Sequence, residues 1–165
     1  CVVFHAPSKS FNIAGLNTSY AIIRDSKLRH AYEVEQAKSG ISNPNPFGLE
    51  ALMAAYEGGE SWLEALKQHL KENIAYVTKF LAQHKIPISA VPTEATYLMW
   101  LDCRGLGLEH KALVDFFVKK AKLGLNDGES FGEAGEGFMR LNIGTSRTVL
   151  QEAMQRIDRA YKDKE

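Results

Sequence analysis

The 165-residue sequence has few cysteines, no long apolar run and no excess of either charge. Cys1 and Cys103 lie far apart and form neither a CxxC metal motif nor a disulfide framework, so we expect reduced thiols. Lys and Arg together number 20, as do Asp and Glu, and this balance argues against a dedicated nucleic-acid binder. The sequence shows neither the roughly 20 apolar residues of a membrane span nor a signal peptide. We therefore expect a soluble, cytoplasmic protein with no nucleic-acid or membrane partner.

Motifs for metals and nucleotides are also missing. The five histidines lack the i, i+4 spacing that places two imidazoles on one helix face, so we expect no metal site. There is no GxSxG elbow, no phosphate loop and no GxGxxG after a strand. Gly132, Gly135 and Gly137 superficially resemble a dinucleotide motif, but they precede a predicted strand, whereas that motif follows one.

The composition itself is that of an ordinary globular protein, with 45% hydrophobic and 24% charged residues. The length allows one domain or two small ones, with enough chain to bury a core. The chain begins CVVFHAPSK, without Met and inside an apolar run that predicts a strand. We therefore expect it to be a fragment of a longer protein.

In the first half, short apolar runs alternate with helical patterns. Residues 1–4 predict a buried strand that stops before a proline, and residues 20–23 predict a second strand. Residues 27–38 have a helical pattern, residues 39–46 contain two prolines and a glycine that break it, and residues 47–56 resume it.

A long amphipathic helix is predicted after the glycine pair at residues 58–59. Ser61 and Glu64 have the spacing of a capping box at its start. Its apolar residues recur every three or four positions, which predicts one buried stripe: Leu63, Leu66, Leu70, Ile74, Val77 and Leu81.

The second half predicts strands that alternate with helices, which favours an α/β or α+β layer of helices on a small sheet. Residues 124–137 hold five of the 13 glycines and are expected to form a mobile loop. The predicted strands are residues 88–91, 96–101 and 138–143, and the predicted helices are residues 111–122 and 148–162.

Lys9 is the candidate nucleophile. It follows the first predicted strand and lies between Ser8 and Ser10. A lysine held among apolar neighbours loses hydration, its pKa falls, and the neutral amine can attack a carbonyl to form a Schiff base. From this one residue alone, a surface lysine remains the commoner interpretation.

Four segments carry a resemblance to a known family, in the family's order and along nearly the whole chain. They are APSKSFNIAGL at residues 6–16, NPFG at residues 45–48, LNDG with FG at residues 125–132, and GEGFMRLN at residues 135–142. The first closely resembles the pyridoxal-phosphate lysine segment of fold-type-I enzymes. The set resembles the MalY/PatB family of cystathionine β-lyase-like C-S lyases, which are relatives of the class I and II aminotransferases.

The resemblance implies an α/β fold, the C-terminal part of the fold-type-I pyridoxal-phosphate-dependent transferase fold. Residues 1–60 would end the large cofactor-binding domain, and residues 61–165 would form a linking helix and the small C-terminal domain. It also implies a missing N-terminal half and a homodimer, with residues 42–47 near the neighbouring subunit's site.

The resemblance also assigns roles to three residues. Lys9 would be the Schiff-base lysine for pyridoxal 5'-phosphate and the acid/base that takes the α-proton. Ser8 would help hold the cofactor phosphate, and Arg140 would bind the α-carboxylate of a small amino-acid substrate through two parallel hydrogen bonds. Arg147 is a weaker candidate and is interpreted as part of a helix start.

Two positions depart from the pattern of many aminotransferases of this fold. Asn17 stands where they carry an arginine that grips the phosphate, and Ala6 stands where they often carry a serine. The acidic residue that pairs with the pyridine nitrogen has no candidate in this chain.

The resemblance favours a C-S β-lyase that acts on cystathionine, cysteine or a related S-substituted amino acid and releases a thiol, pyruvate and ammonia. An aminotransferase would use the same lysine and arginine, but relatives of that kind more often carry Ser-Pro-Gly in place of the LNDG segment. A third possibility is a regulatory role, because some members of this family also bind a transcription activator.

Overall fold

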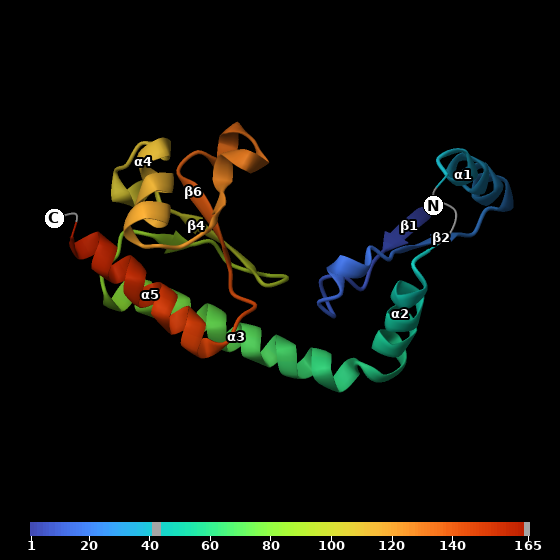
Figure 1. The fold of residues 1–165 in the computed structure, drawn as a ribbon, viewed down its shortest axis with the longest axis horizontal. Helices are drawn as coiled ribbons and strands as arrows, with labels where there is room; N and C mark the ends of the chain where they lie inside the picture. Colours follow the sequence, from blue (N-terminus) through green and yellow to red (C-terminus); the bar gives the residue numbers. More distant parts are fainter. Residues whose placement is uncertain (41–43, 164–165) are drawn as a thin grey trace. The chain divides into compact units, whose positions relative to one another are not determined.

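The chain folds into two compact units, Cys1–Leu66 and Lys67–Glu165, in the computed structural model, which describes residues 1–40 and 44–163. Each unit has its own sheet and helices (Figure 1). The unit boundary falls six residues after the boundary expected at residue 60. The assignment of the two parts to a large cofactor-binding domain and a small domain stays a prediction.

A two-stranded antiparallel sheet begins the first unit. Strand β1 (Val2–His5) pairs with β2 (Tyr20–Ile23), and a 3-10 turn, Ala14–Leu16, lies in the connection. Helix α1 (Ser26–Lys38) follows because Asp25 caps it, accepting a hydrogen bond from the Leu28 amide at 2.8 Å. The strands and this helix lie where the sequence predicts them.

The predicted burial of the first strand is wrong within this unit. All four residues of β1 are exposed, and the Phe4 side chain is 62% exposed. The described residues supply only β2 as a neighbouring strand, and Phe4 reaches α1 through one ring contact with Tyr32, with centroids 5.9 Å apart. An apolar run predicts that a strand can be buried, but it does not supply the layer that buries it.

Helices α2 (Pro46–Gly58) and α3 (Glu60–Gln83) follow almost without interruption. Asn45 caps α2, and Pro46 occupies its first turn, where no amide partner is needed. The predicted capping box of Ser61 is wrong. Gly59 keeps helical backbone angles, and its carbonyl accepts the Leu63 amide at 3.0 Å, so α3 begins before Ser61.

The second unit is built on a four-stranded antiparallel sheet in the order β3-β4-β6-β5. Side chains alternate along its two central strands, so that one face is buried and the other is half-buried. The buried face carries Met99, Leu101, Met139 and Leu141, which are at most 4% exposed. The strands are β3 (Ser89–Ala90), β4 (Leu98–Asp102), β5 (Asn126–Asp127) and β6 (Phe138–Asn142).

Helices α3 and α5 (Arg147–Lys162) lie side by side in this unit (Figure 1). His84, just after α3, contacts Asp158 of α5 with 3.0 Å between Nδ1 and Oδ1. The predicted stripe of α3 is buried at Leu70, Val77 and Leu81. The stripe also contains a polar residue that periodicity does not predict. Asn73 is fully buried and donates to the backbone carbonyls of Ile143 and Thr145 at 2.8 and 3.1 Å.

Two segments of this unit differ from the prediction. The helix expected at residues 111–122 is α4 (His110–Asp115), which widens into a π-helical turn, Phe116–Lys120. The glycine-rich residues 124–137 are not an open loop, because they contain β5 and two 3-10 turns, Gly128–Phe131 and Glu133–Gly135. None of the helices in the described parts of the chain is long and apolar enough to cross a membrane.

Candidate functional site

Lys9 lies in a closed turn directly after β1. The Phe11 amide donates to the Pro7 carbonyl at 2.9 Å, and the Ile13 amide donates to the Ser8 carbonyl at 3.2 Å. Pro7 is buried and Ser8 is half-buried, whereas Lys9 is exposed in this unit. The predicted place at the end of a strand is therefore confirmed, but the described residues do not enclose the amine in an apolar environment.

Aromatic contacts fix this turn against α2 and the start of α3. The Phe11 ring lies 6.0 Å from the Tyr56 ring and 6.1 Å from the Trp62 ring. Gly59 permits this approach, because a Cβ there would lie 2.6 Å from Phe11 Cε1. Tyr20 of β2 joins the cluster through its hydroxyl, 3.3 Å from that of Tyr56. The backbone that carries Lys9 is thus held from two sides.

Asn17 has a backbone conformation that suits asparagine. Its φ of 48° lies in the left-handed region, where asparagine is several-fold enriched over other non-glycine residues. The next residue, Thr18, is buried against α2, and a Cβ on Gly48 would meet its Oγ1 at 1.8 Å. The backbone at Asn17 is therefore fixed in a form that suits asparagine.

Arg140 lies in the middle of β6, on the half-buried face of the second sheet. Its Nε and Nη2 atoms both donate to Oδ1 of Asn126 on the neighbouring β5, at 3.3 and 3.1 Å. The guanidinium also lies over the Phe131 ring, 4.3 Å from its centroid. No carboxylate of the described residues forms an ion pair with it. An oriented but uncompensated guanidinium is suited to bind a carboxylate.

Aromatic rings surround this arginine on the same face. Trp100 is the β4 partner of Arg140 in the strand register, and its ring meets Phe131 edge-on at 5.6 Å and stacks on Phe138 at 5.7 Å. Such rings displace water from around a charge and so strengthen its interactions. The roles of Asn126 and Phe131 were not predicted, although both belong to segments of the resemblance, because their contacts depend on strand register and on the fold of residues 128–135.

The remaining predicted residues are placed as follows. Ser8 and Lys9 belong to the first unit, whereas Arg140 belongs to the second. Arg147 is the first residue of α5 and lies over the Tyr76 ring at 4.9 Å, which confirms its interpretation as part of a helix start. Of the segment expected near a neighbouring subunit, residues 42 and 43 lie outside the described residues.

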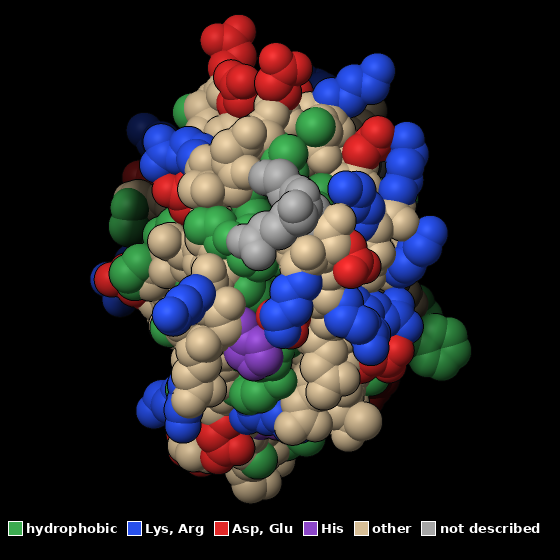
Figure 2. Space-filling view, turned by 90° about the vertical axis from the view of Figure 1, so that its left-hand side faces the viewer, with side chains coloured by type: hydrophobic (Ala, Val, Ile, Leu, Met, Phe, Trp, Pro, Cys, Tyr) green, Lys and Arg blue, Asp and Glu red, His purple; other side chains and the backbone are tan. Residues whose placement is uncertain are grey.

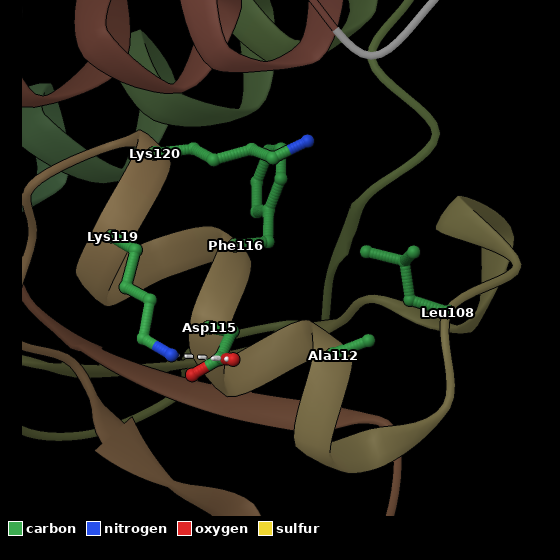
Figure 3. Close-up of a pocket in the computed structure, with 6 residues that line it drawn as sticks. All are labelled: Leu108, Ala112, Asp115, Phe116, Lys119 and Lys120. Carbon is green, nitrogen blue, oxygen red and sulfur yellow. Dashed lines mark hydrogen bonds and ion pairs between the residues drawn. The ribbon is translucent and has the colours of Figure 1, made fainter.

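A hollow of about 320 Å³ lies beside α4 (Figure 3). Leu108, Ala112 and Phe116 line it, and its charged groups include Asp115 and Lys119, which pair with each other at 2.8 Å. It contains no predicted site residue. The face shown in Figure 2 mixes Lys and Arg with Asp and Glu side chains and has no broad field of one sign. The described residues contain no cluster of three metal-ligating side chains.

Comparisons with known proteins agree on one family. The family described as aminotransferase class I and II matches residues 1–157. The chain is 38% identical to cystathionine β-lyase PatB of Bacillus subtilis, over 94% of this chain and 40% of that protein. It is 36% identical to protein MalY of Escherichia coli, over 89% of this chain and 38% of that protein.

Solved structures agree with these sequence matches. Cystalysin from Treponema denticola, whose crystal structure contains a pyridoxal 5'-phosphate cofactor, is 32% identical with a TM-score of 0.94, over 99% of this chain and 42% of that one. The chain thus spans about two-fifths of the length of these relatives. The α/β fold implied by the four motifs is confirmed, and the chain belongs to the class I and II aminotransferase family.

Proposed function

We propose that the protein containing this chain is a pyridoxal-phosphate-dependent C-S β-lyase. It would cleave cystathionine, cysteine or a related S-substituted amino acid to a thiol, pyruvate and ammonia. The observation that carries the proposal is Lys9 on a fixed turn at the end of a strand, in a chain of this family. The names of the relatives, a cystathionine β-lyase among them, favour the lyase over the aminotransferase.

The donor set of the first unit fits the cofactor. The amine of Lys9 can condense with an aldehyde, and the adjacent hydroxyl of Ser8 can donate to a phosphate oxygen. Asn17 supplies no positive charge there, and a neutral hydrogen bond has about half the strength of a charge-assisted one. When bound, pyridoxal phosphate supplies an electron sink for the charge that develops at Cα.

Residues of this chain would bind the substrate and transfer the proton. Arg140 binds the substrate carboxylate with two parallel donors and so fixes the direction of the Cα–H bond. The amine of Lys9 would take the proton from Cα as general base. Asn126 and Phe131 hold the guanidinium in one plane, so that the carboxylate meets an oriented partner.

The wider setting follows the same proposal. The active enzyme would be a cytoplasmic homodimer in which each subunit contains the rest of the fold. Its substrate would be a small amino acid with a sulfur leaving group at Cβ.

The test uses the complete enzyme with pyridoxal phosphate and measures pyruvate release from cystathionine without an added 2-oxo acid. K9A should abolish release and remove the visible band of the lysine-bound cofactor at about 420 nm. K27A, at an exposed lysine in α1 of the same unit, is the matched control and should retain both.

Other outcomes separate the alternatives. Turnover that requires a 2-oxo acid would indicate an aminotransferase. A complete protein without the visible band would favour the regulatory role. A K9A enzyme that keeps the band would contradict the assignment of Lys9.

A further inference from the structure

His110, the first residue of α4, bridges two parts of the glycine-rich segment. Its Nε2 lies 2.6 Å from Oδ1 of Asp127, and its Nδ1 accepts the Gly137 amide at 3.1 Å. The His110 side chain is 9% exposed, and the carboxylate of Glu129 lies 3.8 Å from the same Nε2. A nearly buried imidazole with a partner on each nitrogen is a structural connection and not a surface residue.

The two contacts fix which nitrogen carries the proton. A backbone N–H can only donate, so Nδ1 must accept and is unprotonated in this arrangement. The ring proton therefore lies on Nε2 and is donated to the Asp127 carboxylate. The imidazole therefore connects Gly137 to Asp127, and it accepts a hydrogen bond from the first and donates one to the second.

Asp127 links His110 to the residues that contact Arg140. Its Oδ1 also accepts the Glu129 amide at 2.9 Å and so starts the 3-10 turn Gly128–Phe131. Asn126, which holds the guanidinium, is the preceding residue, and Phe131, which lies against the guanidinium, ends the turn. Both groups that orient Arg140 thus belong to the piece of chain that Asp127 organises.

The contact with His110 supports a short edge strand. Strand β5 is only two residues long and lies at the edge of the sheet, so its hydrogen bonds to β6 hold it on one side alone. Among the described residues, His110 is the side chain that forms a hydrogen bond or ion pair with the Asp127 carboxylate.

We propose that His110 is a positioning residue for the carboxylate site of Arg140, acting through Asp127 and the Asn126–Phe131 segment. This inference rests on the proposed function, in which Arg140 binds the substrate carboxylate. His110 touches neither Arg140 nor any reacting atom in this arrangement. Its effect is on the affinity of the site for carboxylates.

Two substitutions separate the two contacts of the imidazole. In H110N the amide oxygen lies near the place of Nδ1 and can accept the Gly137 amide, but the bond to Asp127 is lost. In H110Q the longer side chain can place an amide donor near the position of Nε2 and keep the bond to Asp127. H30N, at an exposed histidine of α1, is the matched control.

The assay measures kcat and KM for cystathionine in the complete enzyme, together with the inhibition constant of propionate, which has a carboxylate but no amine. A carboxylate contact made equally in the ground and transition states affects KM and leaves kcat largely unchanged. H110N should raise KM and the propionate constant about tenfold, equivalent to about 1.4 kcal/mol. H110Q should remain within about threefold of wild type, and H30N should not change either constant.

D127S breaks the same bond from the other side. A serine oxygen can still accept the Glu129 amide but is too short to reach His110, so the turn keeps its cap. D127S should match H110N, and this second variant keeps the test decisive if H110N does not fold. A crystal structure of either variant should show Asn126 Oδ1 and Arg140 Nη2 more than 3.5 Å apart.

The double variant with R140K separates this inference from the proposed function. If His110 acts through Arg140, H110N should add little to the effect of R140K. If R140K itself leaves KM unchanged, the proposed role of Arg140 fails. If R140K raises KM but H110N and D127S do not, or if H110N lowers kcat alone, the inference about His110 is overturned and the proposed function stands.

Discussion

Replacing Gly135 by alanine should damage the protein at the point where the two 3-10 turns meet. Gly128 and Gly135 lie back to back, and a Cβ on Gly135 would lie 2.0 Å from the Gly128 carbonyl oxygen and 2.4 Å from its carbon. An ordinary contact lies at 3.4–4 Å, so one backbone must move by about 1.4 Å to restore it. Both atoms belong to the main chain, and no side chain can rotate away to relieve the overlap.

The cost follows from overpacking in a closed turn. Extra carbon atoms forced into a packed site destabilise a protein by about 1–3 kcal/mol, and we expect G135A to lie in this range. The shift also moves the turn that ends at Phe131, so G135A should weaken the binding of carboxylates. The free energy of unfolding in urea and the propionate inhibition constant measure the two effects in the complete enzyme.

Gly124 provides the control because it lies at the start of the same segment. A Cβ there meets nothing within 4 Å, and its φ is outside the left-handed region. Alanine at such a position restricts the unfolded chain and stabilises by up to about 1 kcal/mol. The two substitutions should therefore differ in sign. If G135A unfolded at the same urea concentration as G124A, the close packing of the two turns would be refuted.

Three other predictions concern separate parts of the second unit. N73A should lower the free energy of unfolding by about 1–3 kcal/mol in urea titrations, because the buried Ile143 carbonyl loses its donor, whereas the half-buried Thr145 carbonyl keeps His69 Nε2 at 2.8 Å. Burial raises the pKa of the Cys103 thiol from 9.0 to about 12, so the unfolded state releases this proton at a lower pH than the folded state. The free energy of unfolding should therefore fall between pH 9 and 12. C103A should lack this fall when unfolding is measured as a function of pH. F131L should raise the KM for cystathionine about threefold, since the Arg140 guanidinium loses a ring contact of about 0.5–1 kcal/mol; an unchanged KM would exclude that contact as a source of affinity.

Local patterns predicted the regular elements well. The last helix, expected at residues 148–162, is Arg147–Lys162, and its cap is Ser146, whose hydroxyl accepts the Val149 amide. The strand expected at residues 138–143 is Phe138–Asn142. These elements are specified by neighbours within a few residues, through the period of their apolar side chains and the chemistry of their caps.

The glycine-rich segment shows where local patterns fail. Many glycines predict an irregular backbone, and residues 124–137 were expected to be a mobile loop. In the structure, Gly128 is needed because the carbonyl oxygens of Gly135 and Phe138 would lie 2.3 and 2.4 Å from a Cβ there. This requirement arises from residues seven and ten positions away, and a window of neighbouring residues does not reveal it. The same glycines that suggested mobility allow close packing.

In the candidate site, too, one feature follows from the local pattern and another depends on distant residues. Alternation along β6 places Arg140 on the face opposite Met139 and Leu141, so the face on which it lies follows from the sequence alone. The sequence alone does not predict that Asn126 is its partner, because a shift of one residue in the register of β5 would bring Leu125 or Asp127 opposite the arginine instead. An aspartate there would pair with the guanidinium and compete with a substrate carboxylate. The observed register places a neutral amide next to Arg140 and directs the carboxylate of Asp127 to His110, so register decides whether this arginine can serve as a carboxylate site.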